Sequence, residues 1–219
     1  MTAPPRALGF TVWLAVTLAV GCSAGRRPAS IPANHPVDPS SQPGSLAQAR
    51  DLFYRAVEGD TEALSRCEEV LAALPAEDPR VQAYRGACQM LRSARARLPW
   101  EKGKFAKAGL VLLDSTVAAA PSDPEVRFVR GMTCYNLPAL FNRSSLAARD
   151  LAEVAGRAEA ASADGTLPPA LAAASLYHYG VIQTRAGDKA AAASLWRRAV
   201  ALAPMSRAGQ RAMEDLARP

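Results

Sequence analysis

Apolar residues recur every three to four positions from residue 45 to the C-terminus, the spacing that places them on one face of an α-helix. Glycine and proline interrupt this pattern and divide the region into about nine predicted helices. The interruptions lie at Gly59-Asp60, Pro75 to Pro79, Pro99, Pro121 to Pro124, Pro138, Gly165 to Pro169, Gly187-Asp188 and Pro204. No stretch alternates apolar and polar residues over the length of a strand. We therefore predict an all-α fold.

The helical region repeats itself. The segments Asp78–Gly86 and Asp123–Gly131 share Asp, Pro, Val, Arg and Gly at the same offsets, 45 residues apart. Each segment follows an apolar stretch that ends at a proline, Pro75 or Pro121, so the repeating unit is a pair of helices. Each Asp-Pro pair places a capping carboxylate before a proline suited to the first helical turn.

A third unit carries the sharpest pattern. It reads Leu176-x-x-Tyr179-Gly180-x-x-Gln183, then Gly187-Asp188, then Ala192-x-x-x-Trp196-x-x-Ala199 and finally Pro204. This unit resembles a tetratricopeptide repeat, in which small residues let two antiparallel helices approach and a large aromatic side chain fills the gap. The resemblance implies an α-solenoid of stacked hairpins over residues 45–219. An irregular helical bundle with accidental spacing is the alternative.

The earlier repeats match the family less well. Gly86 and Gly131 occupy the small position of the inner helix, like Gly180. Two segments, Arg92 to Lys104 and Asn136 to Ser145, are predicted to lengthen turns that are usually tight in the family. The second of these carries Leu137, Leu140 and Phe141, which would either plug the hairpin core or offer an apolar lip to a partner.

The N-terminus resembles a bacterial lipoprotein signal. Arg6 precedes an apolar run over residues 8–20, and small residues lead to Cys22. The resemblance implies that residues 1–21 are cleaved and that the Cys22 thiol is acylated; an ordinary signal peptide with a free Cys22 is the alternative. Residues 22–44 hold five prolines among small polar residues and are predicted to form a disordered tether. Ser23 favours the periplasmic face of an outer membrane, if the host has two membranes.

Charge and cysteine content narrow the partners only slightly. The net charge is +6, and the stretch from Arg80 to Lys107 holds eight basic residues against Glu101 alone. This stretch is either a solvated helix face or a surface for anionic headgroups, lipopolysaccharide or an acidic partner. An export signal argues against nucleic acid as a partner.

Besides Cys22 the chain has three cysteines, Cys67, Cys88 and Cys134. We expect them as buried free thiols, with a Cys67 to Cys88 bridge as the alternative.

Residues for catalysis are sparse. His35 falls in the predicted tether and His178 stands alone, so the sequence offers no histidine pair for acid–base work or for a zinc site. Carboxylates such as Asp114 and Asp150 are scattered on helices, where we expect solvated faces. The sequence predicts no enzyme activity, metal or cofactor.

What remains is a binding surface. In tetratricopeptide proteins the inner helices line a groove, and the resemblance assigns to it seven side chains: Arg80, Tyr84, Phe128, Tyr135, Tyr177, His178 and Arg185. The packing positions of the repeats are Gly86, Gly131, Gly180, Ala192, Trp196, Ala199 and Pro204.

We expect a non-catalytic scaffold that is held to the membrane by its lipid and binds another envelope protein. The alternative is a small-ligand or lipid-binding accessory protein of envelope transport, with a closed apolar pocket near the segment Trp100 to Phe105 or near the loop Leu137 to Phe141. The partner and the oligomeric state are not predictable from these residues.

Overall fold

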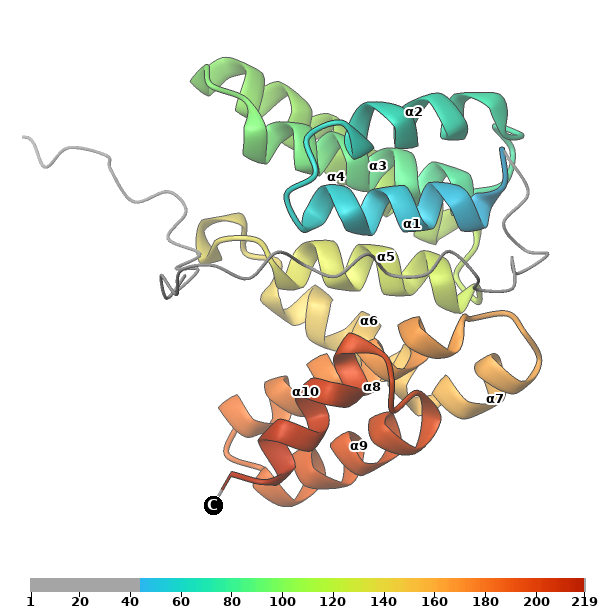
Figure 1. Ribbon diagram of the computed structural model, residues 1–219. Coiled ribbons are helices and arrows are strands. Elements are labelled where there is room, and N and C mark those ends of the chain that lie inside the picture. The colour runs from blue at the N-terminus through green and yellow to red at the C-terminus, as the bar shows by residue number, and fades with distance from the viewer. Residues whose placement is uncertain (1–43, 219) are drawn as a thin grey trace, which may run out of the picture. The chain divides into compact units, whose positions relative to one another are not determined.

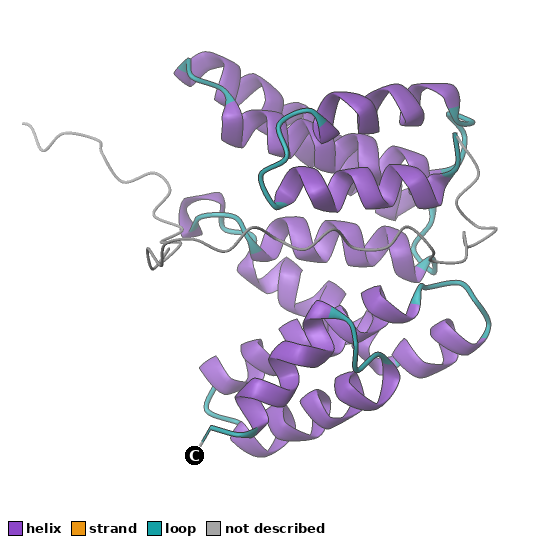
Figure 2. Cartoon of the chain, viewed as in Figure 1, coloured by secondary structure: helices purple, strands orange, loops and turns teal. Residues whose placement is uncertain are grey.

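Ten α-helices and one short 3₁₀ helix make up the computed structural model over residues 44–218, the part of the chain that it describes, with no strand in that range (Figures 1 and 2). The α-helices are α1 (Leu46–Val57), α2 (Ala63–Ala73), α3 (Pro79–Arg95), α4 (Pro99–Ala119), α5 (Pro124–Tyr135), α6 (Ser144–Gly156), α7 (Ala158–Ala163), α8 (Pro169–Arg185), α9 (Lys189–Leu202) and α10 (Arg207–Leu216). The 3₁₀ helix η1 (Ala139–Phe141) precedes α6. The predicted all-α fold is confirmed.

The helices pair as hairpins that stack in chain order. The pairs are α1 with α2, α3 with α4, α5 with α6, and α8 with α9 (Figure 1). Each first helix packs on the first helix of the next hairpin, as α1 does on α3, α3 on α5 and α5 on α8. The second helices α2, α4 and α6 pack on the first helix that follows them. Successive hairpins therefore share a continuous core, the defining property of a helical-repeat array.

One helix more than expected arises between the third and fourth hairpins. The chain leaves helical geometry at Arg157, where φ is −115° and ψ is 7°. This break follows Gly156 and separates α6 from the short α7, which packs on α8. Because Arg157 carries no proline or glycine signal itself, the apolar pattern alone predicts one continuous segment there.

The repeated Asp-Pro motif starts two of the first helices, as predicted. The Asp78 carboxylate accepts the backbone N–H of Arg80 at 2.8 Å at the start of α3. The Asp123 carboxylate accepts the backbone N–H groups of Glu125 and Val126, at 2.9 and 3.1 Å, at the start of α5. These bonds satisfy donors that would otherwise lack a partner in the first turn of each helix.

Glycine sets the close approach within the second and third hairpins. A Cβ at position 86 would lie 2.9 Å from Cγ of Leu113, and one at position 109 would lie 2.8 Å from the Gly86 carbonyl oxygen. In the third hairpin a Cβ at Gly131 would lie 3.1 Å from Cβ of Asp150. The predicted packing role of Gly86 and Gly131 is therefore met by direct contact with the second helix of the same hairpin.

The fourth hairpin packs around Trp196. A Cβ at Gly180 would lie 2.7 Å from Cδ1 of the Trp196 ring, and the indole N–H donates to the Tyr177 carbonyl oxygen at 3.1 Å. Ala192 and Ala199 are buried on the same helix, with 1% and 0% of their surface exposed. Pro204 is exposed just after α9 ends. Small residues and one aromatic side chain thus join α8 to α9 as the sequence predicts.

The prediction of a lengthened turn between Arg92 and Lys104 is wrong. Both ends of that segment are helical, and only residues 96–98 connect α3 to α4. Arginine and alanine favour helix, and Pro99 is accommodated in the first turn of α4 rather than ending a loop. The α3–α4 hairpin therefore gains length as helix.

The other predicted insertion, between α5 and α6, is a true irregular segment. Leu137 and Phe141 pack against the core, whereas Leu140 is 75% exposed. Two apolar side chains of the segment thus close the core, as in the first of the two alternatives, while Leu140 faces outward and its contact with a partner stays a prediction.

The three cysteines in the described region are free and buried, as expected. Cys67 donates its thiol hydrogen to the Ala49 carbonyl oxygen at 3.2 Å, and its sulfur lies 3.7 Å from that of Cys88. Burial raises the pKa of the Cys134 thiol to about 11, so that thiol stays protonated at neutral pH. All three act as small apolar groups in this fold.

The buried hydrophobic residues of the core run from Ala49 to Ala212. The unit formed by residues 38–219 thus contains the whole of this core, and a fragment of residues 44–219 retains every contact described. No helix among the described residues has the length and apolar character needed to cross a bilayer. The predicted signal segment 1–21, Cys22 and nearly all of the predicted tether 22–44 lie outside the described residues.

The two tryptophans of the helical region give a test of the packing. Trp196→Ala removes the ring that separates α8 from α9 and should lower the free energy of unfolding by about 3 kcal/mol. Trp100→Ala is the matched control, because the Trp100 side chain is 69% exposed and its loss should change stability by less than about 0.5 kcal/mol. Urea unfolding followed by circular dichroism measures both. Equal effects of the two substitutions would contradict the assigned packing.

Candidate functional site: the face formed by the first helices

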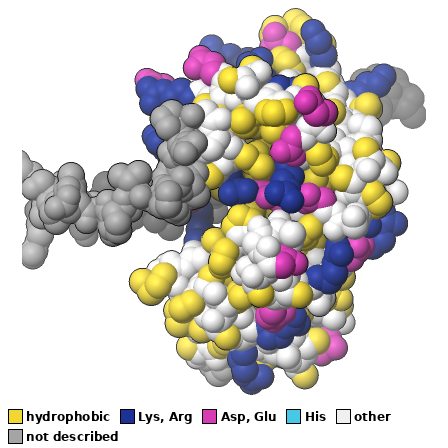
Figure 3. Space-filling view, turned by 90° about the vertical axis from the view of Figure 1, so that its right-hand side faces the viewer, with side chains coloured by type: hydrophobic (Ala, Val, Ile, Leu, Met, Phe, Trp, Pro, Cys, Tyr) yellow, Lys and Arg dark blue, Asp and Glu magenta, His cyan; other side chains and the backbone are white. Residues whose placement is uncertain are grey.

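The first helices of the hairpins, α1, α3, α5 and α8, form a row, which we call the first-helix face. They pack on one another directly, whereas the main contacts of the second helices run to first helices. The last helix, α10, packs on α8 and α9 and so extends the row by one helix. On the side of the molecule that Figure 3 shows, basic and acidic side chains are interspersed.

A buried carboxylate joins three of these helices. Glu125 of α5 is 1% exposed, and its oxygens accept two N–H groups from Arg50 of α1 at 2.8 and 2.9 Å. The Tyr84 hydroxyl of α3 donates to the same carboxylate at 2.9 Å. Burial raises the pKa of Tyr84 well above that of free tyrosine, so the hydroxyl remains a donor. We call Arg50, Tyr84 and Glu125 the Glu125 cluster.

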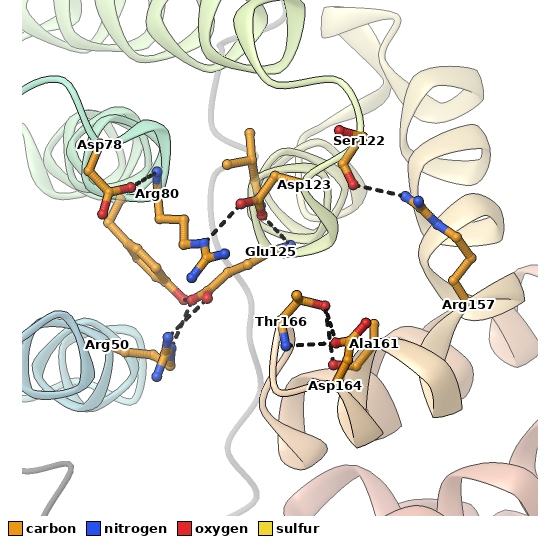
Figure 4. Close-up of polar contacts among 12 residues, drawn as sticks. Arg50, Asp78, Arg80, Ser122, Asp123, Glu125, Arg157, Ala161, Asp164 and Thr166 are labelled. Carbon is orange, nitrogen blue, oxygen red and sulfur yellow. Dashed lines mark hydrogen bonds and ion pairs between the residues drawn. The ribbon is translucent and has the colours of Figure 1, made fainter.

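A second ion pair links the two copies of the Asp-Pro motif. Nε of Arg80, which lies in the first copy, donates at 2.8 Å to the Asp123 carboxylate that caps the second copy (Figure 4). Figure 4 shows Arg80 beside the Glu125 cluster, with Asp78 on the same helix. The hydrogen bond to Asp123 is the chief cause that raises the pKa of Arg80. The repeat in the sequence thus corresponds to a direct contact between successive first helices.

A cluster of aromatic and basic residues lies further along the face. The His178 ring of α8 meets the rings of Tyr135 and Tyr177 edge to face, with centroids 5.0 and 5.1 Å apart. The Arg185 guanidinium lies 5.4 Å from the centroid of Tyr135. The Tyr177 hydroxyl donates to Asp215 of α10 at 3.0 Å. We call Tyr135, Tyr177, His178 and Arg185 the His178 cluster.

The imidazole of His178 is held neutral. Burial, followed by the positive charges of Arg211, Arg185 and Arg207, lowers its pKa to about 4. Nδ1 of His178 is the one buried side-chain nitrogen or oxygen without a hydrogen-bond partner among the residues described. Buried polar atoms nearly always have a partner, so this nitrogen is an exception within the described fold.

An ion pair connects the two ends of the first-helix face. Arg207 at the start of α10 lies 2.7 Å from the carboxylate of Glu58, which follows α1, although 149 residues separate them. Both side chains are more than half exposed, so the pair contributes little to stability. It shows that the first and last helices approach each other.

The seven residues predicted to line the groove divide into two sets. Four of them, Arg80, Tyr135, His178 and Arg185, are exposed or half-buried. Tyr84 and Phe128 are 0% and 1% exposed, and Tyr177 is 8% exposed, which corrects their assignment to an open groove. Helical spacing places these side chains on the correct helices, but successive first helices pack so closely that the larger apolar rings fill the space between them.

Two groups of charged residues differ from what the sequence predicts. Asp150 was expected on a solvated face, yet it is fully buried and accepts two N–H groups from Arg130 at 2.7 and 2.9 Å. Arg50 and Glu125 were not singled out at all. Their pairing joins positions 75 residues apart, and no local pattern in the chain marks it.

No group of three or more His, Cys, Asp or Glu side chains in the described region is placed to hold a metal ion. His178 makes no hydrogen bond to a hydroxyl, thiol or carboxylate within residues 44–218. Trp100 is largely exposed, and the pocket expected near Trp100 to Phe105 or Leu137 to Phe141 stays a prediction.

Comparison with protein families, with curated proteins and with solved structures finds no match to this chain.

Acid should weaken the fold through His178. Its pKa is about 6.5 when unfolded and about 4 when folded, so the unfolded chain binds more protons between these values and stability falls as the pH drops through this window. The charged neighbours that oppose protonation are Arg185 on α8 and Arg207 and Arg211 on α10, with Asp215 as the acidic group nearby. His178→Phe should reduce this acid-dependent loss of unfolding free energy by about 2 kcal/mol.

Urea unfolding of the wild type and of His178→Phe at about pH 7.5 and about pH 4.5 measures the difference. Carboxylates titrate in both proteins. The informative quantity is therefore how much the loss of unfolding free energy between the two pH values differs between the wild type and His178→Phe. An identical pH dependence in the two proteins would refute the buried, neutral imidazole.

Proposed function

We propose that this chain is a lipid-anchored adaptor of the bacterial envelope with tetratricopeptide-like repeats, and that it binds a segment of another protein on its first-helix face. The observation that carries the proposal is the His178 cluster. An unpartnered Nδ1, two tyrosine rings and nearby arginines converge there without being coupled to a nucleophile or a metal site in the described region.

The chemistry of the cluster fits a peptide. Tyrosine and arginine supply large contact area and several donors at a modest entropic cost, which makes them frequent anchors of protein interfaces. Arg185 is exposed, and its guanidinium carbon lies 5.4 Å from the centroid of the Tyr135 ring. A peptide carbonyl or an acidic side chain can accept from such donors, and a helical-repeat array presents them along a row of parallel helices.

Anchoring supports the same role. The Cys22 pattern predicts acylation, and the proline-rich residues 22–44 would separate the helical domain from the membrane. A protein fixed to a membrane by a flexible tether and built from stacked hairpins is suited to positioning a partner rather than to making or breaking bonds. The envelope location rests on the signal pattern.

Crosslinking can test the binding face. A photoreactive amino acid in place of Arg185 should yield one discrete adduct with an envelope protein in growing cells. The same amino acid in place of Arg149, which is exposed on α6, is the matched control and should yield none. Adding Arg211→Glu should reduce the Arg185 adduct at least about fivefold, because a positive charge next to His178 is reversed. The same adducts from both positions, or none from either, would count against the face.

Fatty-acid labelling can test the anchor. Cells that express the full chain are grown with an alkyne-bearing fatty acid. The fatty acid should label a product that begins at residue 22. Cys22→Ser should remove the label, whereas Cys134→Ser should leave it unchanged, because Cys134 is a buried thiol of the helical domain. An unlabelled product from the wild-type chain would eliminate the lipoprotein assignment while leaving the binding face open.

A further inference from the structure

The α3–α4 hairpin is the longest in the described region, and its connected end extends beyond α1 and α2 (Figure 1). Helix α3 has 17 residues and α4 has 21, joined by residues 96–98. At this end lies the cluster of basic residues that the first-helix face does not use.

One side of α4 combines aromatic and basic side chains. Trp100, Lys104, Lys107 and Val111 follow one another at spacings of four, three and four, which places them on one helix face. All four are exposed, Trp100 and Val111 by 69% and 61%. Arg97 and Leu98 in the preceding turn are exposed beside them. We call these six residues the α4 basic face.

The charges of this face are not consumed by the fold. Within residues 44–218, Arg97, Lys104 and Lys107 make no ion pair, whereas Arg92 is held by Glu68 at 2.6 Å. Arg95 is also engaged, since it donates to the carbonyl oxygen of Ala56. Glu101 is the one acidic residue between positions 80 and 107, against eight basic residues.

We propose that the α4 basic face docks on the surface of an anionic phospholipid bilayer. Trp100 and Leu98 would enter the headgroup region, where the amphipathic indole ring is favoured, and the three free basic side chains would reach the lipid phosphates. Negative surface potential attracts each of these cations. An exposed tryptophan, an exposed leucine and unpaired cations on one protruding end favour a bilayer over an acidic protein. The inference does not depend on acylation of Cys22.

The fragment of residues 44–219 allows a test without the N-terminal apolar segment. In a Trp196→Phe background, Trp100 is the single tryptophan of this fragment. The fragment should co-sediment with vesicles of phosphatidylcholine and phosphatidylglycerol, and not with phosphatidylcholine alone. Its fluorescence should shift to shorter wavelength on binding, and added salt should weaken binding because the attraction is electrostatic.

Two variants that lose the same positive charge test whether vesicle binding depends on the α4 basic face or only on net charge. The triple variant Arg97→Gln, Lys104→Gln, Lys107→Gln should weaken vesicle binding at least about tenfold. The control Arg149→Gln, Lys189→Gln, Arg197→Gln removes the same charge from exposed positions on α6 and α9 and should bind within about twofold of the parent. Circular dichroism should show that both variants are folded, since every substituted side chain is exposed.

Two results would overturn the proposal. One is equal weakening by the two triple variants, which would reduce the effect to net charge. The other is no binding of the parent fragment to anionic vesicles, which would leave an acidic protein as the partner of the face. Failure here does not affect the crosslinking or labelling tests, because neither uses α4.

Discussion

The buried carboxylate of Glu125 is the constraint on which the geometry of the first three hairpins depends. Its partners come from α1 and α3, so the three first helices can keep this charge paired only in one relative arrangement. Leaving such a charge without its partner costs several kcal/mol, whereas the intact pair is close to neutral in stability. The cluster therefore determines how the first helices are arranged more than how stable the stack is. Apolar packing supplies the stability.

Asp150 has the same role one layer away, within the third hairpin. It is enclosed beside Gly131, where the absence of a side chain lets α6 approach α5, and Arg130 supplies the opposite charge. Two buried carboxylates with bidentate arginine partners thus fix contacts between and within hairpins. In contrast, the fourth hairpin is closed by a tryptophan ring against a glycine, with no charge in the contact.

Features with a local cause were predictable from the sequence. The Asp-Pro caps, the small residues at Gly86, Gly131 and Gly180, and the Trp196 contact each follow from a few neighbouring positions, and the structure has all of them. The turn between α3 and α4 was not predictable, because a proline marks either the end of a helix or its first turn. The seven groove residues were placed on the correct helices, but Tyr84 and Phe128 are buried since exposure depends on the distance between helices.

Contacts between distant segments were beyond reach of the sequence. Arg50 and Glu125 look like ordinary surface residues of amphipathic helices, and only folding reveals that one of them is enclosed. The same holds for His178, whose neutral state depends on arginines of α10 that follow it by about thirty residues in the chain.

Helix α10 covers one side of the fourth hairpin. It buries Ala208, Gly209 and Ala212 against the fourth hairpin and turns charged and amide side chains outward: Arg207, Gln210, Arg211 and Glu214. Met213, which is 43% exposed, is the large apolar side chain among these polar groups of α10. The side of α8 and α9 that α10 covers is thereby withdrawn from solvent, so a partner could reach it only by displacing this helix.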